Sequence, residues 1–235
     1  MRPKIILPVI LFVFLSTLTC VSQQTEVPQF AAFSAFSYLS TPSLNLVQRG
    51  FDGDFGYNYN SWLTFGFDFS YNGGNSSLLP QYLNTATQAK LAMFLHSLPP
   101  GSIPPGYVLA VPYNSSTYTY EAGPQFNYRR LKHVTFFARP ALGALHGTFT
   151  AKPKDPLTSA IVGGLLNGKT SSSDTVVFYG FGGGITWEIT PHFGLRVASD
   201  FVHFNYFSNI LDGGRNSVRV VVGTKFSFGK NAIKK

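Results

Sequence analysis

The sequence predicts an all-β fold: an eight-stranded antiparallel up-and-down transmembrane β-barrel. Three observations lead to this prediction: long segments in which apolar and polar residues alternate, a short apolar segment at the N-terminus, and connections that alternate between short and long. The segment from Ser217 to Gly229 shows the alternation most clearly, and a period of two residues is typical of a strand. Its apolar face consists of Val218, Val220, Val222, Thr224, Phe226 and Phe228.

Other long segments repeat this division into one apolar or aromatic face and one face of small and charged residues. Around Phe67, for example, aromatic residues alternate with Thr64, Gly66 and Asp68. A tilted strand crosses a bilayer with roughly 9–11 residues, and in a small transmembrane barrel its apolar face contacts lipid. The alternative is a soluble lipocalin-like barrel, which would turn the aromatic faces inward around a small apolar ligand.

The N-terminal segment favours the exported, membrane-inserted barrel. Met1 to Lys4 carries two positive charges and precedes an apolar run from Ile5 to Leu15. This pattern is typical of a secretory signal peptide, and the run is too short for a transmembrane helix. We expect residues 1–22 to be the signal peptide, with lipidation of Cys20 as the alternative. Cleavage after Ser22 leaves no cysteine, and therefore neither a disulfide framework nor a cysteine nucleophile.

Residues 23–229 are expected to form one barrel domain, followed by a basic C-terminal tail at 230–235. The expected strands are 28–40, 47–58, 62–72, 115–129, 134–149, 174–189, 193–207 and 216–229. Tight turns follow the second, fourth and sixth strands, whereas the longest loops cover residues 73–114 and 150–173. In an up-and-down barrel alternate connections lie on opposite sides of the membrane. Both ends of the domain should therefore lie on the side of the short turns.

The loop at 73–114 contains a possible amphipathic helix, indicated by helical spacing of its apolar residues. That spacing runs from Leu83 to Leu98, and Pro99-Pro100 ends it. A lid, an adhesive tip and an interfacial helix are open alternatives, and a variable loop that packs on itself is the simplest interpretation.

A phosphate-loop pattern, G-x-x-x-x-G-K-[ST], occurs from Gly163 to Thr170. Its mechanism requires a preceding strand and a following helix. Ala160 to Val162 is short enough to be such a strand, but a loop entering a strand follows the motif. We therefore interpret the match as accidental and expect Lys169 to be a solvated loop residue. The glycines between Gly180 and Gly184 are interpreted as permitting bending or close packing inside a narrow barrel.

The formal net charge of +8 raises the question of a nucleic-acid partner. Nucleic-acid binding requires a basic stripe with interleaved aromatic residues. Here the aromatic residues lie on strand faces that exclude charge, so no nucleic-acid partner is expected.

Four segments resemble a family of small bacterial outer-membrane β-barrel domain proteins, OmpA/OmpX-like in architecture. They are YTYEAGPQFNYRR (118–130), FFARPALGALHG (136–147), GFGGGITWEITPHFGLRVASD (180–200) and NSVRVVVGTKFSFG (216–229). The resemblance covers roughly residues 115–229 and implies a monomer in the bacterial outer membrane, with lipid and the barrel-assembly machinery as partners. One departure concerns the assembly signal, because Phe228 is followed by Gly229 and the tail rather than ending the chain.

Parity places most of the acids on the inward face together with several cations. The expected interior ion network consists of Asp52, Asp54, Asp68, Glu121, Arg139, Glu188, Arg196, Asp200, Arg219 and Lys225. Lone charges in a narrow interior are costly, so they should pair. Arg196 is expected to pair with Glu188, Asp200 or an acid on a neighbouring strand. A polar conduit or gate is the alternative interpretation, although eight strands leave room for little more than side chains.

Catalytic signals are weak. Lipid-modifying outer-membrane enzymes use a histidine and serine with a carboxylate, and neither His146 nor His203 occurs in a His-x-Ser pattern. His203 with Ser199 is the nearest pair, and no metal-ligand spacing or cofactor motif appears. The sequence thus predicts a structural or loop-mediated interaction role without catalysis, metal or cofactor, and with an extracellular partner left unspecified. A narrow conduit and a lipid-modifying enzyme are the functional alternatives.

Overall fold

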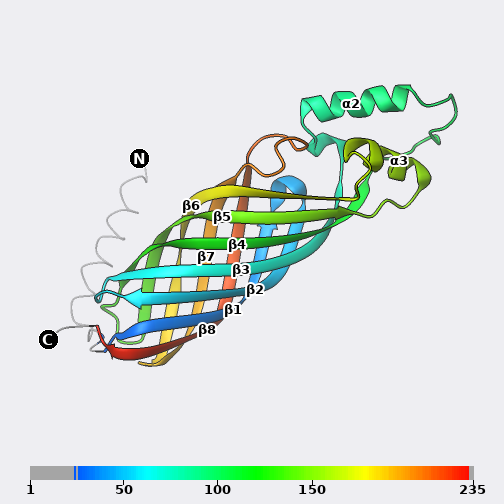
Figure 1. The fold of residues 1–235 in the computed structure, drawn as a ribbon. Coiled ribbons are helices and arrows are strands. Elements are labelled where there is room, and N and C mark those ends of the chain that lie inside the picture. Colours follow the sequence, from blue (N-terminus) through cyan, green and yellow to red (C-terminus); the bar gives the residue numbers. More distant parts are fainter. Residues whose placement is uncertain (1–23, 25, 233–235) are drawn as a thin grey trace, which may run out of the picture.

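The computed structural model describes Gln24 and residues 26–232, so the expected signal peptide and residues 233–235 lie outside the described residues. Eight strands form a closed barrel in chain order, and each strand pairs antiparallel with its sequence neighbours, β1 with β8 included (Figure 1). The strands are β1 (Pro28–Thr41), β2 (Leu46–Asn58), β3 (Leu63–Leu78), β4 (Val111–Tyr128), β5 (Val134–Ala151), β6 (Ser171–Thr190), β7 (Phe193–Phe204) and β8 (Arg215–Asn231). The predicted eight-stranded up-and-down barrel is confirmed.

The outer surface carries a band of aromatic and aliphatic side chains. Phe67 is 50% exposed and Phe181 68% exposed, although both are large and apolar. Tyr118 and Tyr128 on β4, like Tyr179 and Trp187 on β6, face outward near the two ends of the apolar row of their strand, and roughly 9–11 residues suffice to cross the membrane. Such aromatic girdles are characteristic of transmembrane barrels. The soluble alternative with inward aromatic faces is contradicted.

Within the described residues, no helix combines the length and the hydropathy that crossing a membrane requires. Two short 3-10 helices, η2 (Pro42–Leu44) and η3 (Pro80–Tyr82), and two α-helices, α2 (Thr85–His96) and α3 (Pro156–Leu165), lie in the connections. Both α-helices lie at one end of the barrel, opposite the start of β1 and the end of β8 (Figure 1). The short turns and both described chain ends thus share one side, which we call the turn end, and the other side is the loop end.

Four strands extend further toward the loop end than expected. The expected loop 73–114 begins within β3, which continues to Leu78, and it ends within β4, which starts at Val111; the expected loop 150–173 loses residues to β5 and β6 in the same way. The cause is a change of polarity, because beyond the membrane band the outward residues become polar, as at Asn75 and Asn114. The alternation of apolar outward residues with polar inward residues therefore ends before the strands end, and the sequence pattern makes these strands look shorter than they are.

Three smaller boundaries also differ from expectation. Strand β7 ends at Phe204, not at residue 207, and β8 continues to Asn231, so Lys230 and Asn231 belong to the strand rather than to the tail. Ala160 to Val162 lies in α3 and not in a strand, because Asp155 caps the helix by accepting a hydrogen bond from the backbone N of Thr158 at 2.7 Å.

The loop end is closed by a structured cap, made of α2, α3 and the connection between β7 and β8. Leu83 forms a β-bridge with Leu211, and the N-cap residue Asn84 donates through Nδ2 to the carbonyl of Ser208 at 3.0 Å. The apolar core beneath the cap contains Leu44, Leu46, Leu83, Leu91, Tyr113, Ala141, Leu145, Ile161, Phe178, Val202, Phe204, Tyr206, Phe207, Ile210 and Leu211. The expected helix within 83–98 is confirmed, but the long loop packs on other loops and on the barrel mouth, not only on itself.

Candidate functional site

A dense ion cluster crosses the lumen at the middle of the barrel. Arg219 on β8 is 4% exposed, and its guanidinium reaches carboxylates on four different strands. The nitrogen–oxygen distances are 3.2 Å to Asp52, 2.8 Å to Asp68, 3.1 Å to Glu121 and 2.7 Å to Asp200. Since these acids come from β2, β3, β4 and β7, one side chain connects opposite walls of the barrel.

Arg139 on β5 joins the same cluster from another wall. It lies 3.0 Å from Asp68 and from Asp200, 3.4 Å from Glu121 and 3.6 Å from Asp54. Gly182 makes this packing achievable, because a Cβ there would collide with the carboxylate of Asp200. The arginines thus hold their carboxylates with several charge-assisted hydrogen bonds each, which is the strongest class of side-chain hydrogen bond.

The expected partners of Arg196 are wrong. Its guanidinium pairs with Asp54 at 3.2 Å, and Asp54 lies on β2, which is not adjacent to β7. Sequence proximity favoured partners along the wall, whereas a narrow lumen brings side chains together across it. The guanidinium also lies 5.0 Å from the ring centroid of Phe33 and 4.9 Å from that of Phe137, a cation–π arrangement.

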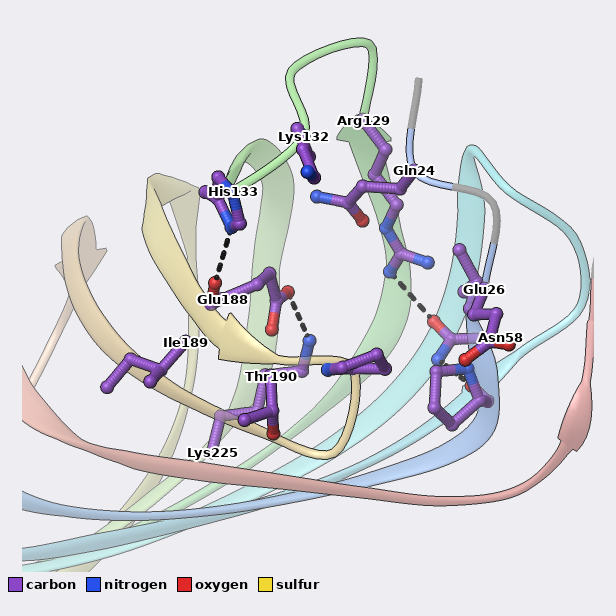
Figure 2. Close-up of a pocket in the computed structure, with 13 residues that line it drawn as sticks. Gln24, Glu26, Asn58, Arg129, Lys132, His133, Glu188, Ile189, Thr190 and Lys225 are labelled. Carbon is purple, nitrogen blue, oxygen red and sulfur yellow. Dashed lines mark hydrogen bonds and ion pairs between the residues drawn. The ribbon is translucent and has the colours of Figure 1, made fainter. Parts of the chain in front are cut away.

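The remaining two residues of the expected network form a separate pair nearer the turn end. Lys225 donates from Nζ to Oε1 of Glu188 at 2.6 Å, while Oε2 of Glu188 is buried without a hydrogen-bond partner among the described residues. This pair lies in the wall of a vestibule of about 190 Å³ that opens at the turn end (Figure 2). The ten predicted residues therefore divide into a central cluster of eight and this peripheral pair.

Sequence reasoning missed Arg129, which follows β4 directly and lines the vestibule. It is 7% exposed, and its Nη2 donates to Oδ1 of Asn58 at 3.0 Å. Parity gave the available signal, because Arg129 continues the inward series of Glu121 and Asn127. The residue stood at the expected end of its strand, where alternation no longer identifies a face.

The histidines do not assemble a catalytic group in the described part of the chain. Nδ1 of His203 lies 2.7 Å from Oδ1 of Asn216, and Nδ1 of His146 lies 2.7 Å from the hydroxyl of Thr175. Four residues along a strand span roughly 13 Å, which separates His203 from Ser199. Among the described residues, no group of three or more His, Cys, Asp or Glu is arranged to hold a metal ion.

The phosphate-loop pattern also lacks its structural context. Gly163 and Gly164 lie inside α3, and β6 begins directly after Thr170. The order of helix and strand is the reverse of the one that phosphate binding requires. Lys169 is exposed between them.

A second cavity, of about 60 Å³, lies under the cap at the loop end. It is lined almost entirely by apolar side chains: Leu44, Leu46, Leu78, Val111, Tyr113, Ser115, Phe149, Ala151, Val162, Leu165, Leu166, Tyr206, Phe207, Ile210 and Leu211. The hydroxyl of Tyr206 is buried there without a hydrogen-bond partner, and burial raises the pKa of that phenol. The cavity thus combines an apolar lining with one unsatisfied polar group.

No family model matches the sequence, and no curated protein matches it. Among solved structures it is similar to Ail, the attachment invasion locus protein of Yersinia pestis, with 17% identity, a TM-score of 0.44 and coverage of 84% of this chain and 96% of that one. Neisserial surface protein A has 13% identity, a TM-score of 0.47 and coverage of 85% and 96%. OprG from Pseudomonas aeruginosa has 8% identity, a TM-score of 0.47 and coverage of 88% and 99%.

These proteins are similar to this chain in architecture only. The closed topology, the lipid-facing aromatic band and the charged interior are properties of this chain itself. The chain is an eight-stranded antiparallel up-and-down transmembrane β-barrel.

Proposed function

We propose that this protein is a non-catalytic barrel of the bacterial outer membrane that anchors a structured cap outside the cell. The barrel does not act as a channel for solutes. The turn end faces the periplasm, and the cap is its surface for interaction with an extracellular partner. Short periplasmic turns and long external loops are the usual arrangement in such barrels.

The main support for this proposal comes from the ion pairs of Arg219. Its ion pairs to Asp52, Asp68, Glu121 and Asp200 close the lumen at mid-height with groups from opposite walls. Opening a conduit would require these charges to separate in a poorly hydrated interior, which costs several kcal/mol per ion. The ion cluster around Arg219 therefore supports a structural role for the barrel, with interaction confined to the loops.

The cap offers the exposed groups that an interaction surface needs. Met93 on α2 is 66% exposed, and Val108, in the connection to β4, is 77% exposed. Exposed apolar side chains outside the lipid band are suited to a protein partner. Because α2 contacts the β7–β8 connection, the side chain of Met93 is held on an ordered helix.

Two measurements test this function. In planar bilayers the wild-type barrel should give only small, infrequent currents, and large steady currents would replace the proposal with the conduit. On intact cells, Met93→Cys should react with a membrane-impermeant maleimide, whereas Asn60→Cys in a turn should react only after the outer membrane is opened. The reverse labelling pattern would place the cap in the periplasm and overturn the orientation.

A second candidate function, capture of a small apolar molecule, is favoured by the cavity under the cap. Apolar cavities stay dry and accept small apolar ligands. Xenon, which is small enough for a cavity of about 60 Å³, should raise the thermal stability of the wild type and of Met93→Trp, which changes an exposed site, but not that of Leu165→Trp, which fills the cavity. Equal stabilisation of all three proteins would contradict this candidate.

A further inference from the structure

Arg129 presents an unmatched charge to the vestibule. Its Nε is buried without a hydrogen-bond partner, and within the described residues its guanidinium forms no ion pair with a carboxylate. Figure 2 shows the guanidinium projecting into the lumen beside Asn58. A buried guanidinium that forms no direct ion pair and leaves one N–H without an acceptor is costly, so the site favours a ligand that brings negative charge and a hydrogen-bond acceptor.

Burial lowers the pKa of Arg129 to about 10, although the negative charge of Glu188 acts in the opposite direction. The side chain is therefore still cationic at neutral pH. Lys132 and His133, both exposed in the turn after β4, stand at the mouth of the same vestibule. Arg129, Lys132 and Lys225 face Glu26 and Glu188 in the lining of the vestibule, so the cations outnumber the carboxylates for a small anion that enters from the turn end.

Glu188 supplies the complementary feature across the vestibule. Lys225 holds Oε1 of this carboxylate, but Oε2 is buried without a partner and so needs a hydrogen-bond donor. The two unsatisfied groups in the vestibule, Nε of Arg129 and Oε2 of Glu188, therefore have opposite requirements. A ligand that both accepts and donates hydrogen bonds satisfies the two together.

We propose that the vestibule binds a protonated phosphate group, as inorganic phosphate or a phosphomonoester. Its unprotonated oxygens accept from Arg129, and its P–OH donates to Oε2 of Glu188. Sulfate and phosphodiesters have no proton to donate at neutral pH, and either would face Glu188 with an oxygen lone pair. The acid thus acts as a selectivity group, and Arg129 provides the affinity.

The experiment is a calorimetric titration of the refolded barrel with inorganic phosphate at pH 6, where phosphate and a large share of a phosphomonoester still carry a P–OH. The detergent is a maltoside, whose headgroup contains no phosphate. The wild type should bind phosphate saturably at one site, and about tenfold more tightly than sulfate. Arg129→Gln should weaken phosphate binding ~tenfold or more. Arg130→Gln, which changes the adjacent exposed arginine, is the matched control and should bind like the wild type. Glu188→Gln should bring sulfate binding close to phosphate binding.

Competition distinguishes the sources of the phosphate group. Glycerol 3-phosphate, a monoester, should displace inorganic phosphate, whereas glycerophosphocholine, a diester headgroup, should not. Equal effects of Arg129→Gln and Arg130→Gln, equal affinity for sulfate, or no saturable binding at phosphate concentrations on the order of 10 mM would each overturn the proposal; the last result would mean that water bridges Arg129 and Glu188.

Folding of each variant is checked by heat-modifiability on gels. If Arg129→Gln does not fold, the wild type still decides the question. Ligand that binds only the folded state raises its thermal stability, so phosphate must stabilise the barrel more than sulfate does at equal ionic strength.

Discussion

The membrane-crossing part of the barrel and its extension toward the cap use the same strands with opposite polarity. On β4, Tyr120 faces outward and Glu121 inward in the membrane band, whereas Asn114 faces outward and Tyr113 inward in the extension. On β5 the same reversal separates Arg139, inward in the band, from Phe149, which packs against the core beneath the cap. The pleat continues unbroken, and only the surroundings of the strand change.

This comparison shows that an alternating pattern reports the contrast between two environments, not the direction of a core. In the band the outside is lipid and the inside holds ions, so apolar residues face out. Beyond it the outside is water and the inside is the apolar underside of the cap, so apolar residues face in. Four tests follow, from the largest expected effect to the smallest, and they compare the membrane band with the loop end.

Removing the central cation tests the charged interior. Arg219→Ala leaves the carboxylates of Asp52, Asp68, Glu121 and Asp200 short of a partner, and breaking such a buried cluster costs about 3–5 kcal/mol. The measurement is urea unfolding in lipid vesicles, followed by tryptophan fluorescence. Arg49→Ala, which removes an outward, exposed arginine, is the control and should change little. A loss no larger than that of the control would show that water, not Arg219, stabilises the acids.

A new arginine at two outward positions of β3 tests the lipid boundary. Phe67→Arg should lower the free energy of unfolding by about 2–4 kcal/mol, because Phe67 lies within the lipid-facing band. Asn75→Arg, on the same face of the same strand but in the extension, should stay within roughly 0.5 kcal/mol of the wild type. Equal losses at both positions, measured in the same vesicles, would contradict a membrane boundary between them.

Replacing the N-cap residue of α2 tests how independent the cap at the loop end is of the barrel. Oδ1 of Asn84 accepts from the backbone N of Thr87 at 2.8 Å at the start of α2. Asn84→Ala should destabilise the cap locally by about 0.5–2 kcal/mol. Hydrogen exchange should accelerate in α2 and in the β7–β8 connection, while the amides of the membrane band keep their protection. Faster exchange throughout the strands would mean that cap and barrel unfold as one unit.

The smallest effect is expected at the phosphate-loop match. Lys169→Ala changes an exposed residue between α3 and β6, so stability should remain within roughly 0.5 kcal/mol of the wild type. Equilibrium dialysis with ATP and Mg²⁺ should detect no specific binding to either protein. Magnesium-dependent ATP binding that the substitution abolishes would contradict our interpretation of the motif.

The sequence alone predicts the strand number, the turns and which residues share a strand face. Those properties follow from a local periodicity of two and from the spacing of turn residues, so they are visible along the chain. It also indicated the helix within 83–98, because an apolar spacing of three and four residues is equally local. The sequence did not indicate α3, which begins at Pro156, because the apolar residues of this helix form no extended pattern.

The ion-pair partners in the lumen, and the point at which the polarity of the strand faces reverses, become visible only in the folded barrel. Closure of the barrel places Arg196 against Asp54 and Arg219 against four strands, and no sequence spacing encodes a distance across a lumen. It likewise leaves Arg129 buried across the vestibule from Glu188 with an unsatisfied donor, and sequence reasoning did not assign this residue to the interior. Side-chain direction is a local property of a strand, but ion pairing, burial and cavities depend on all eight strands closing together.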